Sequence, residues 1–326
     1  MAKRFTRRKC IAAIAAAMLP RHLNAQTAPT PIIGILDSAA ATVLKLSTFY
    51  EGLKVEGFSR NQNLTVQYHS AENDYARLPE LAADLVNRRV ALITAFGAPA
   101  ALAAKAATTK IPVVFAVSTN PIEIGLVASL NHPGANVTGV TGMAVGREQK
   151  RLKLLHAAVP TAPVLGFVLN PQNSNSEAQI NDALAFAHNA GAQIKIIRAT
   201  ARRDFDNVFA ELVQPQAGGL VIADDEFFLS ASTDLGYLAA QHSIPAIFQG
   251  TTFTAAGGLM GYGSRLTELY HQAGAYSGLV LAGAAPAELP VYQSTAVEMI
   301  VNLRSAKSLG VTLPQEIVDQ ATTLIR

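Results

Sequence analysis

The chain has 326 residues, of which 50% are hydrophobic and 15% charged. This length and apolar content allow a large buried core and favour two domains, and a single cysteine excludes an internal disulfide. The formal charge of +3 at pH 7 depends on the fate of a basic N-terminus.

Residues 1–9 carry five lysines and arginines, residues 11–19 are uncharged and rich in alanine, and Leu23-Asn24-Ala25 approximates a small-x-Ala cleavage site. This order predicts a signal peptide, residues 1–25, cleaved near Ala25. The apolar run is shorter than the ~20 residues needed to span a bilayer. The alternative is a basic arm for nucleic acid. The Arg7-Arg8 pair weakly suggests twin-arginine rather than general export.

Cleavage of this segment would change the sign of the chain's formal charge. The segment holds six of the 26 Lys and Arg and none of the 23 Asp and Glu, so 20 basic residues remain and the formal charge becomes −3. Cys10 is lost with it, and no later segment has 18 uninterrupted apolar residues. We therefore expect an exported protein with no nucleic-acid partner and no membrane anchor.

Strand and helix patterns alternate along the first half of the mature chain, and Gly57 is placed to end the first helix. This alternation predicts an α/β fold, with a parallel sheet covered by helices on both faces. The predicted strands are 32–36, 64–68, 90–94 and 112–117. One predicted helix ends near residue 56, and two others span 77–86 and 99–107.

The pattern restarts after Gly142 and predicts a second doubly wound sheet. Residues 286–290 are predicted to form a connecting segment. The predicted strands are 164–169, 194–197, 220–223, 246–248, 259–262 and 297–303, and the main helices are 147–158, 267–281 and 315–325.

A motif occurs twice, 133 residues apart. Ile111-Pro112-x-x-Phe115 matches Ile244-Pro245-x-x-Phe248, and a hydroxyl-rich loop follows each copy. Two copies at this spacing indicate two lobes of one α/β design. Ligands of open parallel sheets bind beyond the carboxyl ends of the strands, so two such sheets would hold a small molecule between their loops.

These stretches resemble the periplasmic solute-binding components of ABC transporters, with the type I periplasmic binding protein fold, and are most similar to the tryptophan/tyrosine-type uptake branch. The likeness spans residues 32–314 in the family's order. The chain departs from the family at Asn120-Pro121, where Asp-Pro is common, which removes a charge beside the expected pocket. The similar stretches are IPVVFAVSTNPIEIGLVASLNHPGANVTGVTG, RLKLLHAAVP, VLNPQNSNS, IPAIFQGTTFTAAGGLMGYG and LAGAAPAELPVYQSTAVEMIVNLRSAKSLGVTLP.

The resemblance implies three chain crossings between the lobes, near Gly142, Tyr262 and Pro290. The first lobe would contain residues 32–141 and 263–289, and the second 142–262 and 290–326. It also implies a small-molecule ligand, with an amino acid or aromatic carboxylate favoured, and delivery to an ABC permease in the inner membrane. We expect a monomer without cofactors.

Polar or small residues follow the predicted strands of the first lobe. The small residues Ala95, Gly97 and Ala98 would let an anionic group approach the amides of a helix N-terminus, although Thr94 could simply cap that helix. Residues 118–120 could contact ligand or form only a hydroxyl-rich turn. The candidate ligand-binding residues of this lobe are Ser38, Thr94, Phe96, Gly97, Ala98, Ser118, Thr119, Asn120 and Thr141.

Three adjacent carboxylates, 224–226, follow a strand of the second lobe. One of Asp224 or Asp225 could hold a ligand ammonium, and the alternative is a solvated cluster capping the next helix. A divalent cation is disfavoured because the calcium-loop pattern is absent. Tyr262 could contact ligand or pack the hinge. The candidate ligand-binding residues of this lobe are Asn170, Asp224, Asp225, Gln249 and Tyr262.

Catalytic and metal motifs are missing from the sequence. There is no G-x-S-x-G, H-E-x-x-H or Walker-A pattern, and the histidines never fall at paired metal spacing. We expect no catalytic residue and no metal. The remaining alternatives are the ligand-sensing domain of a regulator, which would need a helix-turn-helix module, and an exported enzyme on the same fold.

Overall fold

The computed structural model describes residues 30–142, 146–213 and 218–326. The predicted signal peptide lies outside the described residues. Within them, two separate β-sheets organise the chain from residue 31 onward. No helix in these ranges is both long and apolar enough to cross a membrane.

The first sheet has six parallel strands in the order β11-β5-β4-β3-β1-β2. Strand β2 lies on one side of β1, and β3, β4 and β5 follow in order on its other side, so the sheet is doubly wound as predicted. Its strands are β1 (Ile32–Asp37), β2 (Thr65–Ser70), β3 (Leu92–Phe96), β4 (Val113–Val117), β5 (Val137–Thr141) and β11 (Tyr292–Gln293).

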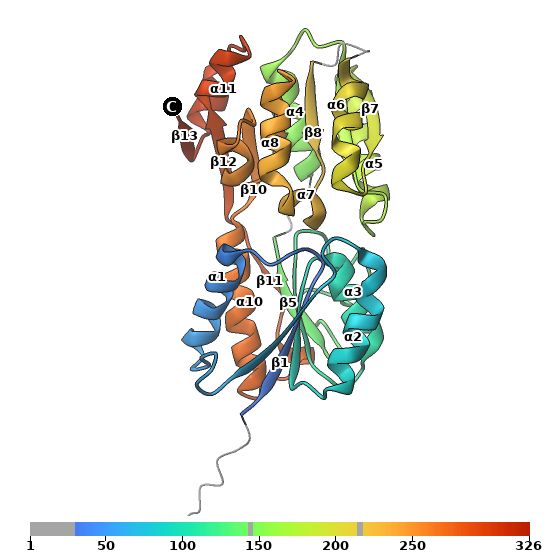
Figure 1. Ribbon diagram of the computed structural model, residues 1–326, viewed down its shortest axis with the longest axis vertical. Coiled ribbons are helices and arrows are strands. Elements are labelled where there is room, and N and C mark those ends of the chain that lie inside the picture. Colours follow the sequence, from blue (N-terminus) through green and yellow to red (C-terminus); the bar gives the residue numbers. More distant parts are fainter. Residues whose placement is uncertain (1–29, 143–145, 214–217) are drawn as a thin grey trace, which may run out of the picture. The chain divides into compact units, whose positions relative to one another are not determined.

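Alternate residues of β1 pack on opposite faces of this sheet. Ile33 and Ile35 pack against α1 (Val43–Val55) and α10 (Leu266–Leu281), whereas Leu36 packs against α2 (Leu78–Asn87) and α3 (Ala98–Ala107). Figure 1 shows the two helix pairs on opposite sides of the sheet. A short 3₁₀ turn, η1 (Tyr75–Arg77), precedes α2.

Helices α1 and α10 approach each other closely enough that glycine is required at the contact. A Cβ atom at Gly52 would lie 1.9 Å from the carbonyl oxygen of His271, and one at Gly274 would lie 2.0 Å from that of Phe49. The backbones of the two helices therefore touch. This contact joins a helix from the start of the first lobe to one that arrives more than 200 residues later.

Within the described residues, the second sheet has seven strands in the order β13-β12-β10-β9-β8-β6-β7, and only the β10–β12 pair is antiparallel. Two parallel-rich α/β sheets confirm the predicted fold class. The strands are β6 (Val164–Leu169), β7 (Gln193–Arg198), β8 (Gly219–Ile222), β9 (Ala246–Phe248), β10 (Met260–Ser264), β12 (Val297–Asn302) and β13 (Thr323–Ile325).

Helices cover both faces of the second sheet. One face carries α4 (Arg147–Ala158), α5 (Ser176–Ala190), α11 (Leu303–Ser308) and α12 (Gln315–Asp319). The opposite face carries α6 (Phe205–Val213), α7 (Glu226–Ser230), α8 (Ser232–Gln241) and α9 (Thr251–Ala255). Short 3₁₀ turns occur at η2 (Arg202–Asp204) and η3 (Pro286–Glu288).

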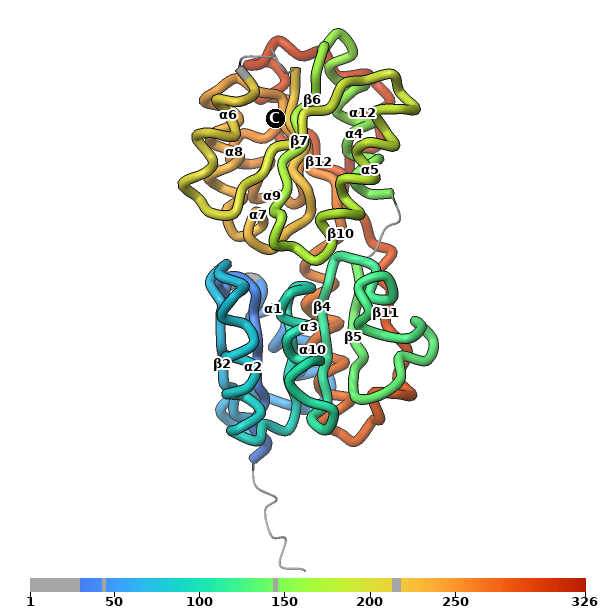
Figure 2. Tube along the Cα trace, turned by 90° about the vertical axis from the view of Figure 1, so that its right-hand side faces the viewer, coloured from blue at the N-terminus to red at the C-terminus, as the bar shows by residue number. Residues whose placement is uncertain are grey.

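The chain passes between the sheets three times, but the second and third passages lie later than predicted. Residues up to Ser264 belong to β10 and therefore to the second sheet. Strand β11 pairs with β5 in the first sheet, and Figure 2 shows these two strands side by side. The return to the second sheet therefore falls between Gln293 and Val297 rather than at 290. The passages are hydrogen-bonded together, because the Arg265 amide donates to the Ala296 carbonyl at 3.0 Å.

One predicted helix is wrong. Residues 315–325 were expected to be helical throughout, but α12 ends at Asp319 and residues 323–325 form β13, which pairs with β12 in parallel. The sequence TLI suits an edge strand as well as a helix end, and the tertiary pairing decides between them.

Candidate functional site

Strand ends from both sheets surround one cleft with three adjoining compartments. The main cavity has a volume of about 330 Å³. A constriction of about 20 Å³ follows, and it shares Glu226 and Gln249 with the main cavity. A polar compartment of about 180 Å³ shares Ser118, Thr119 and Asp224 with the constriction. Residues of both lobes line all three spaces.

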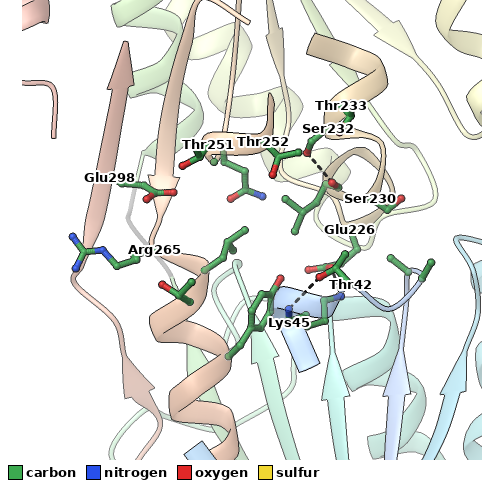
Figure 3. A pocket seen from close by; sticks show the side chains of 18 residues that line it. Thr42, Lys45, Glu226, Ser230, Ser232, Thr233, Thr251, Thr252, Arg265 and Glu298 are labelled. Atoms are coloured by element: carbon green, nitrogen blue, oxygen red, sulfur yellow. Dashed lines mark hydrogen bonds and ion pairs between the residues drawn. The ribbon is translucent and has the colours of Figure 1, made fainter. Parts of the chain in front are cut away.

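A buried ion cluster closes one side of the main cavity. The Lys45 ammonium lies 3.1 Å from Asp37 of the first lobe and 3.4 Å from Glu226 of the second, and Figure 3 shows Lys45 and Glu226 pointing toward one another. The Tyr68 hydroxyl donates to Asp37 at 2.9 Å. Burial opposes the charge on Lys45, but Glu226 and Asp37 outweigh it and raise the pKa of Lys45. Lys45 is therefore a charged bridge between the lobes.

Asp37 is fully buried at the end of β1. Burial raises its pKa to about 6, and this effect is larger than the opposing attraction of Lys45. Its carboxylate also accepts the Ala39 amide at 3.1 Å. Asp37 thus anchors the ammonium group of Lys45 rather than facing a ligand directly.

Gln249, one of the predicted residues, places an unmatched polar atom beside the main cavity. It follows β9, is 3% exposed and lines both the main cavity and the constriction. Its Oε1 has no hydrogen-bond partner among the described residues. A buried acceptor left unmatched costs about 1–3 kcal/mol, so a ligand N–H or O–H donor at this position would be favourable.

Asp224 is occupied by two arginines of α4. Its carboxylate lies 2.5 Å from Arg147 Nη1 and 2.7 Å from Arg151 Nη2, and all three side chains are buried. Burial opposes the ionisation of Asp224, but Arg151 and Arg147 outweigh it and lower its pKa. The role of ammonium contact predicted for Asp224 does not fit this geometry, because its charge is already neutralised.

Asp225 is also surrounded by donors from within the chain. Its carboxylate accepts the Asn170 amide at 3.2 Å, the Asn173 amide at 2.7 Å and the Phe227 backbone N–H at 2.9 Å, which caps α7. The Tyr75 hydroxyl of the first lobe donates at 3.0 Å. These neutral donors already use most of the acceptor positions of the Asp225 carboxylate, so few remain for a ligand ammonium.

We expect Asp225→Asn to flatten the pH dependence of stability. Burial raises the pKa of Asp225 from 3.8 to about 6, although its hydrogen bonds act in the opposite direction. The folded protein thus holds this proton more tightly than the unfolded chain. The resulting stabilisation is complete below about pH 4 and is lost as pH rises through about 6, with a size of about 3 kcal/mol.

Urea denaturation at several pH values between 4 and 7 measures this effect as the difference between the Asp225→Asn variant and the wild type. Asp206→Asn removes an exposed carboxylate and serves as the matched control. Parallel pH profiles for wild type and Asp225→Asn would contradict the assignment.

Five other predicted residues line the smaller compartments. Gly97 and Ala98 line the constriction, and Asn120 lines the polar compartment. Ser118 and Thr119 line both the constriction and the polar compartment. Gly97 has φ +89°, and a Cβ there would lie 2.7 Å from Glu226 Cγ of the opposite lobe. Glycine is therefore needed both for the turn and for the approach of the second lobe.

The remaining predicted residues support the walls of the cleft. The Ser38 hydroxyl accepts the Ala100 amide of α3, and the Thr94 and Ser277 hydroxyls are hydrogen-bonded at 2.8 Å. Further supporting contacts are Phe96 packed edge-on against Phe49 and Tyr270, Thr141 donating to the Thr119 carbonyl, Asn170 donating to Asp225, and Arg151 donating to the Tyr262 carbonyl.

Several residues that line the cleft were not predicted from the sequence, although the sequence pattern around one of them, Lys45, could have revealed it. Lys45 precedes Phe49 by four residues and Leu53 by eight, so it shares their buried helix face. A lysine on an apolar stripe indicates a buried charge that needs partners. Among the other missed residues are Arg147, Glu148, Gln179, Glu226, Arg265, Tyr270 and Glu298.

A family model described as ABC transporter substrate binding protein matches residues 32–325. Among curated proteins, the Tyrosine-binding protein of Clostridioides difficile (strain R20291) is 26% identical over 261 residues, which is 80% of this chain and 75% of that protein. Two solved structures superpose with TM-scores of 0.82 and 0.80. They are a conserved domain protein from Vibrio cholerae O1 biovar El Tor, and an ABC domain from Streptococcus pneumonia in complex with L-Trp.

These two structures are 24% and 23% identical to this chain, cover 90% and 91% of it, and are themselves covered over 99% and 100% of their length. The likeness shows the two-lobe type I periplasmic binding fold. The chain belongs to the family of ABC transporter substrate binding proteins, a family of binding proteins and not of enzymes.

Proposed function

We propose that this protein is exported to the periplasm, loses its signal peptide near Ala25, and acts there as a monomer. It captures a small organic ligand between its two lobes and delivers it to an ABC permease in the inner membrane. An amino acid or an aromatic carboxylate is the favoured ligand.

The main cavity is the observation that carries this proposal. Its volume of about 330 Å³ lies within the range of small-molecule sites, and both lobes line it. Leu229, Leu266 and Tyr270 supply apolar surface, while Thr251 and Thr252 supply hydroxyls. A ligand that contacts both lobes binds the closed state better than the open state, and this difference drives closure about the three crossings.

The relatives support the ligand class. One is named a tyrosine-binding protein, and another was solved with L-Trp. The apolar wall with one unmatched acceptor, Gln249 Oε1, suits an aromatic body carrying a polar donor.

Calorimetry and X-ray scattering of the mature protein test the proposal. Titration with the twenty amino acids and with aromatic carboxylates is expected to reveal at least one saturable ligand, and that ligand should reduce the radius of gyration. Saturable binding without compaction would contradict hinge closure. Failure of every compound in the set would contradict the proposed ligand class.

We expect Tyr75→Phe to shift the ligand-free protein toward open forms. Contacts between lobes gather at α7, where the Tyr75 hydroxyl donates to Asp225 and accepts the Phe227 amide at 3.3 Å. The Ser230 hydroxyl also lies 3.2 Å from Asn73 Oδ1. Loss of the Tyr75 hydroxyl should weaken closure by about 1 kcal/mol and raise the ligand-free radius of gyration.

Tyr276→Phe is the control for this variant. Its hydroxyl donates to the Pro290 carbonyl at 2.9 Å, away from the contacts that α7 makes with the first lobe. The control should scatter like the wild type. An unchanged scattering profile for Tyr75→Phe would show that this hydroxyl does not hold the lobes together.

A further inference from the structure

The polar compartment of about 180 Å³ is lined by two buried, neutral acceptor atoms that have no hydrogen-bond partner among the described residues. Its lining residues come from the turn after β4, from α4, from α5 and from the end of β8. Thr119 is 8% exposed and Gln179 is 1% exposed, yet Thr119 Oγ1 and Gln179 Oε1 have no hydrogen-bond partner among the described residues. Native proteins rarely leave such atoms unsatisfied.

The orientation of the Gln179 amide is fixed by its other half. Gln179 Nε2 donates to the Asp224 backbone carbonyl at 2.7 Å. The amide cannot be flipped without losing this bond, so Oε1 is the atom left without a donor. Thr119 is similar, because only its backbone carbonyl is engaged, by Thr141.

The charge of the compartment is negative. Asp224 is matched by Arg147 and by Arg151 behind it. Of the other lining carboxylates, Glu123 and Asp182 form no ion pair among the residues that the structure describes. Burial and the neighbouring Asp224 raise the pKa of Glu148 against the attraction of Arg151 and Arg147, so four carboxylates share two arginines. The main cavity differs, because Lys45 and Arg265 there accompany Glu226 and Glu298.

Glu148 is the most buried of these three carboxylates, with 8% exposure. It lies on α4 between the two arginines that hold Asp224, and Gln179 lies on the neighbouring helix α5. A buried carboxylate and two unmatched acceptors correspond to the three N–H donors of one ammonium group.

We propose that this compartment binds the ammonium group of the ligand, with Glu148 as its counter-charge and Gln179 Oε1 and Thr119 Oγ1 as hydrogen-bond acceptors. The inference rests on the proposed function and narrows the ligand to a primary amine. The rest of that ligand extends through the constriction toward the main cavity. Asp224 and Asp225, which also follow β8, position the surrounding wall.

The test compares two amino acids with their desamino analogues. Calorimetry is run with L-tyrosine and 3-(4-hydroxyphenyl)propanoate, and with L-tryptophan and 3-(indol-3-yl)propanoate. Glu148→Gln is expected to weaken amino-acid binding by about 30-fold or more, as for loss of one partner of a buried charged contact, while the desamino compounds change by no more than about twofold. Glu177→Gln removes an exposed carboxylate from α5 and is the matched control.

Thr119→Val is the second variant, since it keeps the side-chain shape and removes only the unmatched hydroxyl. It should weaken amino-acid binding about fivefold and keep the unfolding temperature of the ligand-free protein at or above that of the wild type, because an unmatched buried hydroxyl is removed. Equal losses for amino acids and desamino compounds in Glu148→Gln, or no loss at all, would overturn the ammonium site. A wild-type protein that binds desamino compounds as tightly as amino acids would overturn it and leave the proposed function intact. Failure of all four probes would overturn both the ligand class and the site.

Discussion

Replacement of Arg151 by methionine is expected to lower the free energy of unfolding by about 3–5 kcal/mol, because it leaves a buried charge without one of its partners. Arg151 is fully buried, lies 2.7 Å from Asp224 Oδ1 and donates to the Tyr262 carbonyl at 2.8 Å. Its guanidinium also lies over the Phe248 ring. Methionine keeps much of the apolar bulk, so the loss reports the polar contacts.

Urea denaturation measures this loss, and Arg88→Met is the control. Arg88 is 51% exposed and pairs with Asp84 one helical turn away, so its replacement should leave the urea midpoint close to that of the wild type. A similar cost for the two variants would mean that the buried cluster does not stabilise the fold beyond a surface pair.

The second large effect is expected for Gly52→Ala. Alanine favours a helix over glycine by about 1 kcal/mol, yet its Cβ would lie 1.9 Å from the His271 carbonyl oxygen. Helices α1 and α10 would have to separate, which should cost about 3 kcal/mol in spite of the better helix propensity. Glu51→Ala, at the neighbouring exposed position, should stay within about 0.5 kcal/mol of the wild type. Thermal unfolding that ranks Glu51→Ala below Gly52→Ala would contradict the close contact.

Periodicity predicted most of the fold because the central strands of both sheets form short, continuously buried apolar runs. The predicted strand 164–169 and helix 147–158 coincide with β6 and α4. What could not be predicted depends on distant pairing. The two-residue strand β11 exists because it pairs with β5, and β13 exists because it pairs with β12.

The site was predicted in outline, since its lining does come from strand ends in both lobes. Local sequence could not reveal which carboxylates have internal partners. Asp224 is matched by arginines 73 and 77 residues earlier in the chain, at 151 and 147, and Lys45 meets Glu226 across 181 residues. Charges at such separations are matched by tertiary packing, and so the ionic character of the cleft emerges only in three dimensions.

The passage of the chain three times between the sheets bears on the order in which the protein can be completed during synthesis. Strands β1 to β5 leave the ribosome first, but α10, which covers their inner face, follows only after most of the second lobe. The second lobe in turn lacks β12 and β13 until the last thirty or so residues are made. Neither lobe can therefore close its core before α10 and β11 have been made. The first lobe has all its strands once β11 is made, and the second only after β13, so the first lobe is completed before the second.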